Sequence, residues 1–202
     1  MWMNDVAAAW TMTSLTTSAT LIALVQTASS LPVLLLGIPS GALADIINRK
    51  HYFLFAQIWL ATNATALMLF IAFDALNPYL LLLLTFTNGI GLAMRWPIFA
   101  AIVPDLVPRD ILPSALALNA IAMNTSRIIG PLTAGAIIAA AGSKYVFALN
   151  MVLSLITVIV VMRWKYQNYV SALPGERFVG AMRVGMQYAW QSNRMRTIIS
   201  RG

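Results

Sequence analysis

Long apolar segments alternate with short polar ones along most of the chain. The apolar segments predict membrane-spanning helices over about residues 21–44, 52–73, 79–103, 114–141 and 145–163. Each is near or above the ~20 residues that an α-helix needs to cross about 30 Å of hydrocarbon. Residues 1–14 are also apolar but too short to cross, so we interpret them as the outer part of a first helix whose start is missing. The pattern predicts an all-α membrane protein.

The polar segments are expected to form turns at alternate faces of the membrane. The outer turns are predicted at residues 11–20, 74–78 and 142–144, and the inner ones at 45–51 and 104–113. Of the 13 Lys and Arg residues, all except Arg95, Arg127 and Lys144 fall on the inner side of this topology. Because an excess of basic residues marks the cytoplasmic side, we expect the inner face to be cytoplasmic.

The composition supports a membrane protein. Hydrophobic residues make up 60% of the 202 residues and charged residues only 9%, whereas a soluble domain has about 25% charged residues. The net charge of +7 would suit a nucleic-acid partner. However, the basic residues lie beside apolar segments on one side, as the positive-inside rule requires. We therefore expect the lipid bilayer, and no nucleic acid, as a partner.

Residues that carry enzyme and metal chemistry are scarce. The sequence has no cysteine and a single histidine, His51, so neither a zinc nor a haem site is expected, and no other cofactor is indicated. We find no set of Ser, His and acid residues, and no glycine-rich phosphate-binding loop after a strand. The sequence therefore predicts neither an enzyme nor a nucleotide-driven pump.

A charged motif lies between the first two long apolar segments. Its residues are Gly41, Asp45, Arg49 and Lys50. They resemble the loop motif between the second and third helices of the major facilitator superfamily, which implies a gate at the cytoplasmic face. Ile46 stands where that motif usually has a basic residue, and Asn48 where it usually has glycine. Gly37 and Gly41 are four residues apart, so we expect a neighbouring helix to approach this face closely.

A second motif lies in segment 114–141. Its residues are Gly130, Pro131 and Gly135. The proline lacks an N–H and is expected to bend the helix, while the glycines are expected to permit close packing against a partner helix. The stretch resembles the Gly-Pro motif in the fifth helix of drug/proton antiporters, with Ser126 and Ala134 as small substitutes in that pattern. The alternative is a packing kink with no role in transport.

Further short matches extend the resemblance over nearly the whole chain. Residues 2–5, 42–45, 103–109, 117–119 and 127–131 are together similar to the exporter branch that includes enterobactin and macrolide efflux proteins. The resemblance implies the N-terminal six-helix half of a secondary active transporter, a multi-pass protein of the bacterial inner membrane. It also implies proton-coupled export of a small amphipathic molecule, such as a drug or siderophore. Export would proceed by alternating access against a missing C-terminal six-helix half.

Three charged residues fall within apolar segments, namely Asp5, Arg95 and Arg127. A charge at the membrane centre costs at least about 2.5–3.5 kcal/mol on the insertion scale, so it usually faces a cavity and serves function. These residues are therefore the candidates for the cavity and for coupling. Asp5 is the only acid in a candidate span, so we expect it to exchange a proton near Arg127. The alternatives are a purely structural bond between helices or, for Arg95, snorkelling toward the inner face.

The chain is predicted to have two regions. Residues 1–163 form the transmembrane bundle, and residues 164–202 form a cytoplasmic linker that leads toward the missing half. Apolar residues at helical spacing predict an amphipathic helix in the linker, at Phe178, Met182, Gly185, Met186 and Ala189. A plain solvated linker is the alternative. Two other functions stay open: a half-transporter that dimerises, and a non-transporting membrane scaffold or gene fragment.

Overall fold

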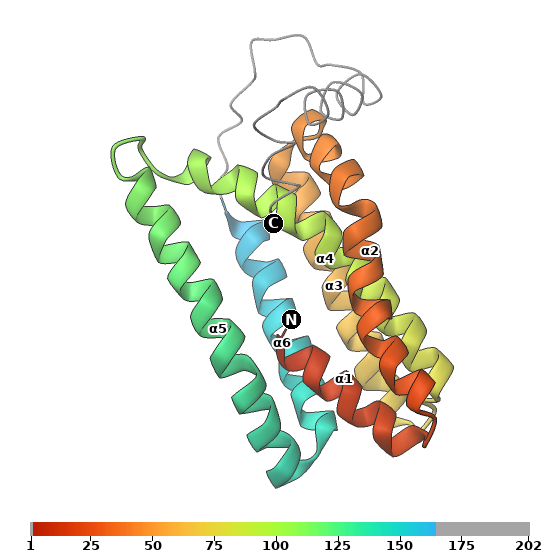
Figure 1. The fold of residues 1–202 in the computed structure, drawn as a ribbon. Coiled ribbons are helices and arrows are strands. Elements are labelled where there is room, and N and C mark those ends of the chain that lie inside the picture. Colours follow the sequence, from red (N-terminus) through yellow and green to blue (C-terminus); the bar gives the residue numbers. More distant parts are fainter. Residues whose placement is uncertain (1, 165–202) are drawn as a thin grey trace, which may run out of the picture.

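The computed structural model describes residues 2–164, which form six α-helices (Figure 1). They are α1 (Trp2–Leu15), α2 (Ala19–Ile46), α3 (Arg49–Ala72), α4 (Pro78–Leu106), α5 (Leu112–Ala141) and α6 (Ser143–Arg163). No strand occurs in this part of the chain, so the predicted all-α fold is confirmed. The linker and amphipathic helix predicted beyond Trp164 lie outside the described residues.

The first turn is shorter than predicted. Residues 11–15 were expected to belong to an outer turn, but they continue α1, and only residues 16–18 separate α1 from α2. The hydroxyl groups of Thr13 and Ser14 each donate to a main-chain carbonyl oxygen of the preceding turn at 2.7 Å. Because such bonds satisfy the hydroxyl groups within the helix, a Thr- and Ser-rich stretch can remain helical.

The two inner turns and the turn between α5 and α6 are also tighter than predicted, whereas the outer turn predicted at 74–78 lies at residues 73–77 with the same length. Arg49, Lys50 and His51 were expected in a loop but form the first turn of α3, where the His51 N–H donates to Asn48 Oδ1 at 3.2 Å. This is an N-terminal cap, which satisfies a main-chain group that the helix itself leaves unpaired. Between α5 and α6 only Gly142 is non-helical. Its φ of +101° is a conformation that glycine adopts readily because it has no Cβ.

Four of the described helices are long and apolar enough to cross a membrane: α2, α3, α4 and α6. The protein is therefore a multi-pass membrane protein. α5 has 30 residues, but the polar run Asn-Thr-Ser-Arg at residues 124–127 interrupts its apolar sequence. α1 has 14 residues and is about 21 Å long at 1.5 Å per residue. It covers only the outer part of the bundle, the lower part in Figure 1.

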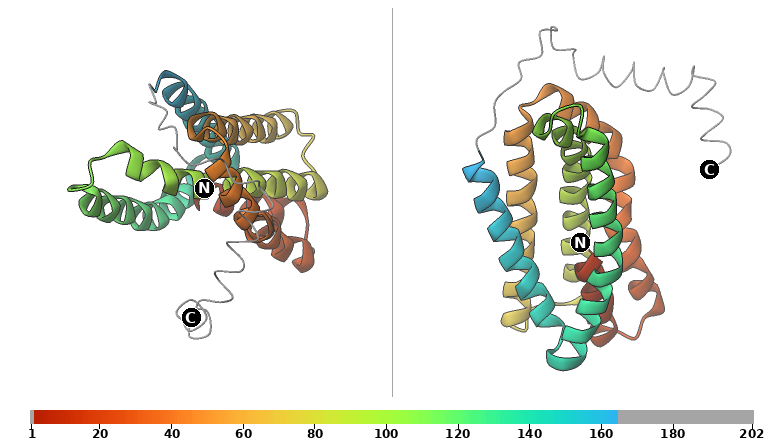
Figure 2. Two further views of the ribbon diagram at one scale, coloured as in Figure 1. Left: turned by 90° about the horizontal axis from the view of Figure 1, so that it is seen from above. Right: turned by 90° about the vertical axis from the view of Figure 1, so that its left-hand side faces the viewer.

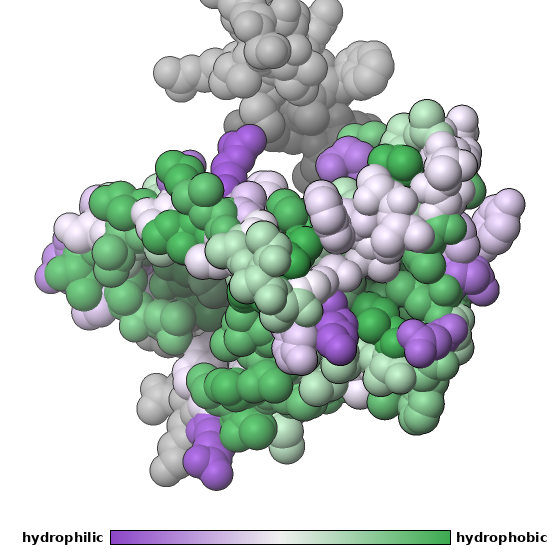
Figure 3. Space-filling view, turned by 90° about the horizontal axis from the view of Figure 1, so that it is seen from below, coloured by the Kyte–Doolittle hydropathy of each residue, from purple (hydrophilic) through white to green (hydrophobic). Residues whose placement is uncertain are grey.

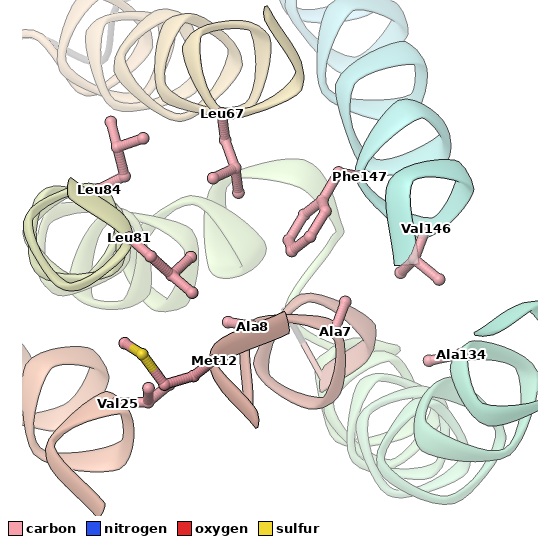
Figure 4. Close-up of a cluster of buried hydrophobic side chains, with 10 residues drawn as sticks. All are labelled: Ala7, Ala8, Met12, Val25, Leu67, Leu81, Leu84, Ala134, Val146 and Phe147. Atoms are coloured by element: carbon pink, nitrogen blue, oxygen red, sulfur yellow. The ribbon is translucent and has the colours of Figure 1, made fainter. Parts of the chain in front are cut away.

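α1 lies at the centre of the helix arrangement. It contacts α5 and α6 on one side and α2 and α4 on the other, while α2 packs along α4 and α3 packs against both α4 and α6 (Figures 1 and 2). Figure 4 shows the buried cluster around α1, in which Ala7 and Ala8 face Phe147 of α6, Leu81 of α4 and Ala134 of α5. Small residues at this position let several helices approach the same short helix.

Two glycines of α4 permit its closest packing. A Cβ at Gly89 would lie 2.7 Å from the main-chain oxygen of Ser29 in α2, and one at Gly91 would lie 2.6 Å from Leu60 Cδ2 in α3. Gly37 and Gly41 of α2, for which the sequence predicted close packing, have more space around them. A Cβ at Gly41 would lie 3.9 Å from Pro97 Cβ, and none of the described residues lies within 4 Å of one at Gly37. Within the described structure, the predicted close approach at Gly37 is therefore wrong.

The outside of the bundle is apolar. Large hydrophobic side chains are exposed on several helices, including Leu34 and Ile38 of α2, Leu118 and Leu132 of α5, and Val160 of α6. Figure 3 shows that hydrophobic residues cover much of the described surface seen from the outer end, and that hydrophilic residues occur there in isolated groups. The exposed apolar side chains on the flanks of α2, α5 and α6 suit contact with lipid, which is as apolar as they are.

Candidate functional site

The charged motif joins helices at the inner face. Arg49 Nη1 donates to the carbonyl oxygen of Ala101 in α4 at 3.2 Å. Lys50 Nζ donates to the carbonyl oxygens of Trp164 at 2.5 Å and Met162 at 3.4 Å, at the end of α6. Cations are favourable near helix C-termini because the last carbonyl groups have no partner within the helix. Asp45 belongs to the last turn of α2, and its side chain lies outside the described part of the structure.

The helix 5 motif lies beside the start of α1. A Cβ at Gly130 would lie 3.0 Å from Trp2 Cβ, so this glycine brings α5 close to α1. Pro131 lies inside α5, and the Thr133 hydroxyl donates to the carbonyl oxygens of Ile129 and Gly130 at 2.9 Å each. A Cβ at Gly135 would have no described atom within 4 Å. Only the first glycine of the motif therefore packs tightly against another described helix.

Asp5 and Arg127 face different neighbours. Asp5 Oδ1 accepts a hydrogen bond from the Ser29 hydroxyl at 3.2 Å, which joins α1 to α2. The Arg127 guanidinium lies over the Trp2 ring, with Cζ 5.5 Å from the ring centroid, which joins α5 to α1. This is within the distance at which a cation and an aromatic face attract each other. Among the described residues, no ion pair connects Asp5 to Arg127.

Arg95 lines a cavity of about 240 Å³ between α4, α5 and the start of α1. We call it the aromatic cavity; its walls are Trp2, Leu92, Arg95, Trp96, Phe99, Asn119, Met123 and Ser126. The lining combines aromatic and aliphatic surface with an arginine, an amide and a hydroxyl group. Such a mixture is typical of small-molecule sites, in which a few polar groups orient a mostly apolar ligand.

A second cavity, of about 170 Å³, lies on the other side of Arg95 between α1, α3, α4 and α6. We call it the donor chamber; Leu60, Leu92 and Leu153 line it together with Asn4, Gln57, Asn88, Arg95, Asn150, Ser154 and Thr157. Arg95 and Leu92 belong to both cavities. Thus Arg95 is the charged candidate that the structure places between two cavities, whereas Asp5 and Arg127 line neither.

Gln57 and Asn150 are site residues that the sequence analysis missed. Each is an amide inside an apolar segment, and an amide in such a setting is the signal that could have identified them. No cluster of His, Cys, Asp or Glu that could hold a metal ion is found in residues 2–164. The chemistry available in the two cavities is therefore hydrogen bonding, positive charge and aromatic contact.

A bundle of long apolar helices defines the class of multi-pass membrane proteins. Residues 1–202 match the sequence profile of a family described as transmembrane secretion effector. The match covers the whole chain, and the chain belongs to this family of the major facilitator superfamily.

Three curated relatives illustrate the similarity. The staphyloferrin A transporter of Staphylococcus aureus is 25% identical over 140 residues, which cover 68% of this chain and 35% of the relative. Macrolide efflux protein A of Streptococcus pyogenes is 25% identical over 178 residues, or 87% and 44% of the two chains. The protein of the same name in Enterococcus faecalis is 25% identical over 159 residues, or 77% and 49%. The chain thus spans less than half the length of these relatives. No solved structure matches it significantly.

Proposed function

We propose that the chain is the N-terminal half of a secondary active exporter for a small amphipathic molecule. The observation that carries this proposal is the aromatic cavity, in which Trp2, Trp96 and Phe99 offer apolar surface beside Arg95 and Asn119. Membership of the transmembrane secretion effector family supports transport. The names of the relatives support a macrolide-like or siderophore-like compound as the cargo, and the word efflux in one of them favours export. We place the protein in the bacterial inner membrane.

The transport cycle would alternate access between two halves. Residues 1–163 would form one rigid bundle and residues 164–202 the linker to a second six-helix half. The coverage of 35–49% of the relatives' lengths supports this organisation. A bound molecule would lie near the middle of the membrane, and the two halves would rock around it.

The charged motif would act as a gate at the cytoplasmic face. Arg49 and Lys50 already join the start of α3 to α4 and α6. We expect Asp45, with Arg49, to latch this face against helix ends of the second half. A carboxylate is stabilised near a helix N-terminus by about 0.3–1 kcal/mol when it is exposed.

The proton gradient would drive export through proton exchange at Asp5. Arginine stays protonated in proteins, so Arg95 and Arg127 cannot carry the proton. The bond from Ser29 gives the Asp5 carboxylate a partner in α2. Breaking and making this bond as Asp5 changes charge would couple protonation to the relative position of α1 and α2.

Efflux by the full-length protein tests the cargo site. We expect Trp96→Ala to lower proton-driven efflux of a fluorescent amphipathic dye by about tenfold, which corresponds to ~1.4 kcal/mol of lost contact. Trp10→Ala is the matched control, because Trp10 is 58% exposed and lines neither cavity. Equal efflux by the two variants at equal expression would contradict the assignment of the aromatic cavity.

A further inference from the structure

Gln57 is the most unusual polar residue in the described bundle. It lies on α3 with only 3% of its surface exposed, and its Nε2 group has no hydrogen-bond partner. The side chain lines the donor chamber. Buried polar groups are nearly always paired, so an unpaired one that faces a cavity points to a partner that binds there.

Arg95 adds an unpaired charge to the same chamber. Within residues 2–164 the structure gives its guanidinium no hydrogen bond and no ion pair. The amide of Asn150 uses one N–H, since its Nδ2 donates to Asn4 Oδ1 at 3.3 Å. The remaining lining includes Asn88 and Ser154, which can also donate, whereas the Thr157 hydroxyl already donates to the carbonyl oxygen of Leu153 at 2.8 Å. Among the described residues, no carboxylate lines the chamber. The chamber therefore holds a surplus of donors and a positive charge.

The chemistry of this lining selects the ligand group. An ionised carboxylate only accepts hydrogen bonds and carries the opposite charge to Arg95, so it could pair with both Arg95 and Gln57. A protonated amine would instead meet a like charge and unmatched donors. A carboxylate is thus the common organic group that satisfies both unpaired side chains at once.

The sizes of the two cavities divide the ligand into two parts. The donor chamber of about 170 Å³ and the aromatic cavity of about 240 Å³ are each smaller than the ~300–1,000 Å³ of sites that enclose a drug-sized ligand, so such a ligand would occupy both. The donor chamber, the smaller and more polar of the two, suits a carboxylate on a short stem. The aromatic cavity shares Arg95 and Leu92 with it and offers Trp2, Trp96 and Phe99 to an apolar body.

We propose that the two cavities form one bipartite site for an amphipathic organic acid, with the carboxylate in the donor chamber and the apolar body in the aromatic cavity. This inference rests on the proposed export function and narrows its cargo to acids, which excludes basic, macrolide-like compounds. Gln57 and Arg95 are the residues that distinguish an acid from its neutral analogue.

Binding of a matched pair of probes to the purified 202-residue chain in detergent tests the inference. The probes are 1-naphthaleneacetate and 1-naphthaleneacetamide, which share the ring and differ in charge. Quenching of tryptophan fluorescence reports binding, because Trp2 and Trp96 line the aromatic cavity. We expect the acid to bind at least tenfold more tightly than the amide, and acetate alone to compete weakly because it lacks the apolar body.

Substitutions then show which residues produce the preference for the acid over the amide. We expect Gln57→Leu and Arg95→Gln each to weaken binding of the acid by about tenfold while changing that of the amide less than twofold, since hydrogen bonds to a charged group are the strong ones. Arg95→Lys keeps the charge and should retain most of the preference. Gln26→Leu is the control for Gln57→Leu, because Gln26 is an exposed residue of α2 that lines neither cavity.

The outcomes separate this inference from the proposed function. Equal affinity for the two probes, binding of neither, or equal losses for both in the Gln57 variant would overturn the inference. If the amide binds as well as the acid and the full-length protein still exports neutral dyes, the export function stands and the acid site fails. If the chain prefers the acid but the full-length protein moves neither probe, the acid site stands and export fails.

Discussion

At the scale of single residues, the space around a side chain and its hydrogen-bond partners distinguish residues that have the same hydropathy. Gly89 and Gly37 occur in similar apolar helices, yet only Gly89 meets another helix closely. Likewise Gln57 and Gln26 are both helical amides, but Gln57 is buried and Gln26 is exposed. The difference in each pair depends on which face of the helix the residue occupies.

The two glycines give a direct test of the helix packing. Gly89→Ala should lower the stability of the detergent-solubilised chain by about 1–3 kcal/mol, because the main-chain oxygen of Ser29, 2.7 Å from the new Cβ, cannot move away easily. Gly37→Ala should be neutral or stabilising by up to ~1 kcal/mol, since alanine favours a helix and has space here. Thermal unfolding followed by tryptophan fluorescence measures both. A larger loss for Gly37→Ala would contradict the α2–α4 packing.

The proposed role of Asp5 in proton coupling can also be tested with a single substitution. In the full-length protein, Asp5→Asn should abolish the dependence of uphill efflux on the proton gradient, because an amide cannot exchange a proton at neutral pH. The amide can still accept the hydrogen bond from Ser29, so the α1–α2 contact seen here should persist. Efflux into inverted vesicles, with and without an uncoupler, is the measurement. If efflux remains proton-dependent, Asp5 is structural and the coupling acid lies in the other half.

At the scale of helices, short turns join successive helices at both ends of the bundle, and charged side chains add bonds between helices at the inner end. Arg49 and Lys50 connect α3 to α4 and α6, while Gly142 alone separates α5 from α6. An inner face held by side-chain bonds can open without unfolding a helix. These side-chain bonds lie where the proposed gate at the inner face would act.

The gate predicts a specific loss of transport. Asp45→Asn in the full-length protein should reduce efflux several-fold, because an amide lacks the charge that favours a helix N-terminus. Asp74→Asn is the matched control: Asp74 is exposed in the outer turn at a φ of +52°, which asparagine also tolerates. Initial efflux rates at equal expression measure both. Unchanged transport by the Asp45 variant, with normal expression, would contradict the gate.

At the scale of the whole molecule, α5 and the start of α1 frame an amphipathic cavity, and α5 also has exposed apolar residues. A bundle of this kind can insert into a membrane by itself, since each long helix pairs its own main-chain groups. Alternating access, however, needs a second body on the far side of the cargo.

The isolated 202 residues therefore provide a further test. We expect them to insert, to self-associate in detergent through exposed apolar surface, and to give no efflux of the dye that the full-length protein exports. Membrane fractionation, light scattering and vesicle efflux measure these three properties. Robust efflux by the isolated chain would contradict the proposal that it is only the N-terminal half of a transporter. It would favour a half-transporter that dimerises.

Much of the architecture could be predicted because hydropathy and turn residues act locally. Residues 52–73 and 79–103 were predicted as helices, and α3 and α4 contain nearly all of both. The errors lie at the ends: Thr and Ser near residue 13 bond within α1, and Asn48 caps α3 earlier than the charged residues suggested. The family could also be inferred, because its short motifs are contiguous in sequence.

The sequence by itself determined the helices, the membrane class, the family resemblance and the charged residues that need an explanation. Only the tertiary structure decided which side chains lie near one another. Arg95 lines two cavities, one of which also contains Gln57, while Asp5 faces Ser29. The reason is physical. In a soluble helix, a polar face marks the side that points to water. In these helices the lipid and the core are both apolar, so the pattern does not say how each helix is rotated, and packing decides it.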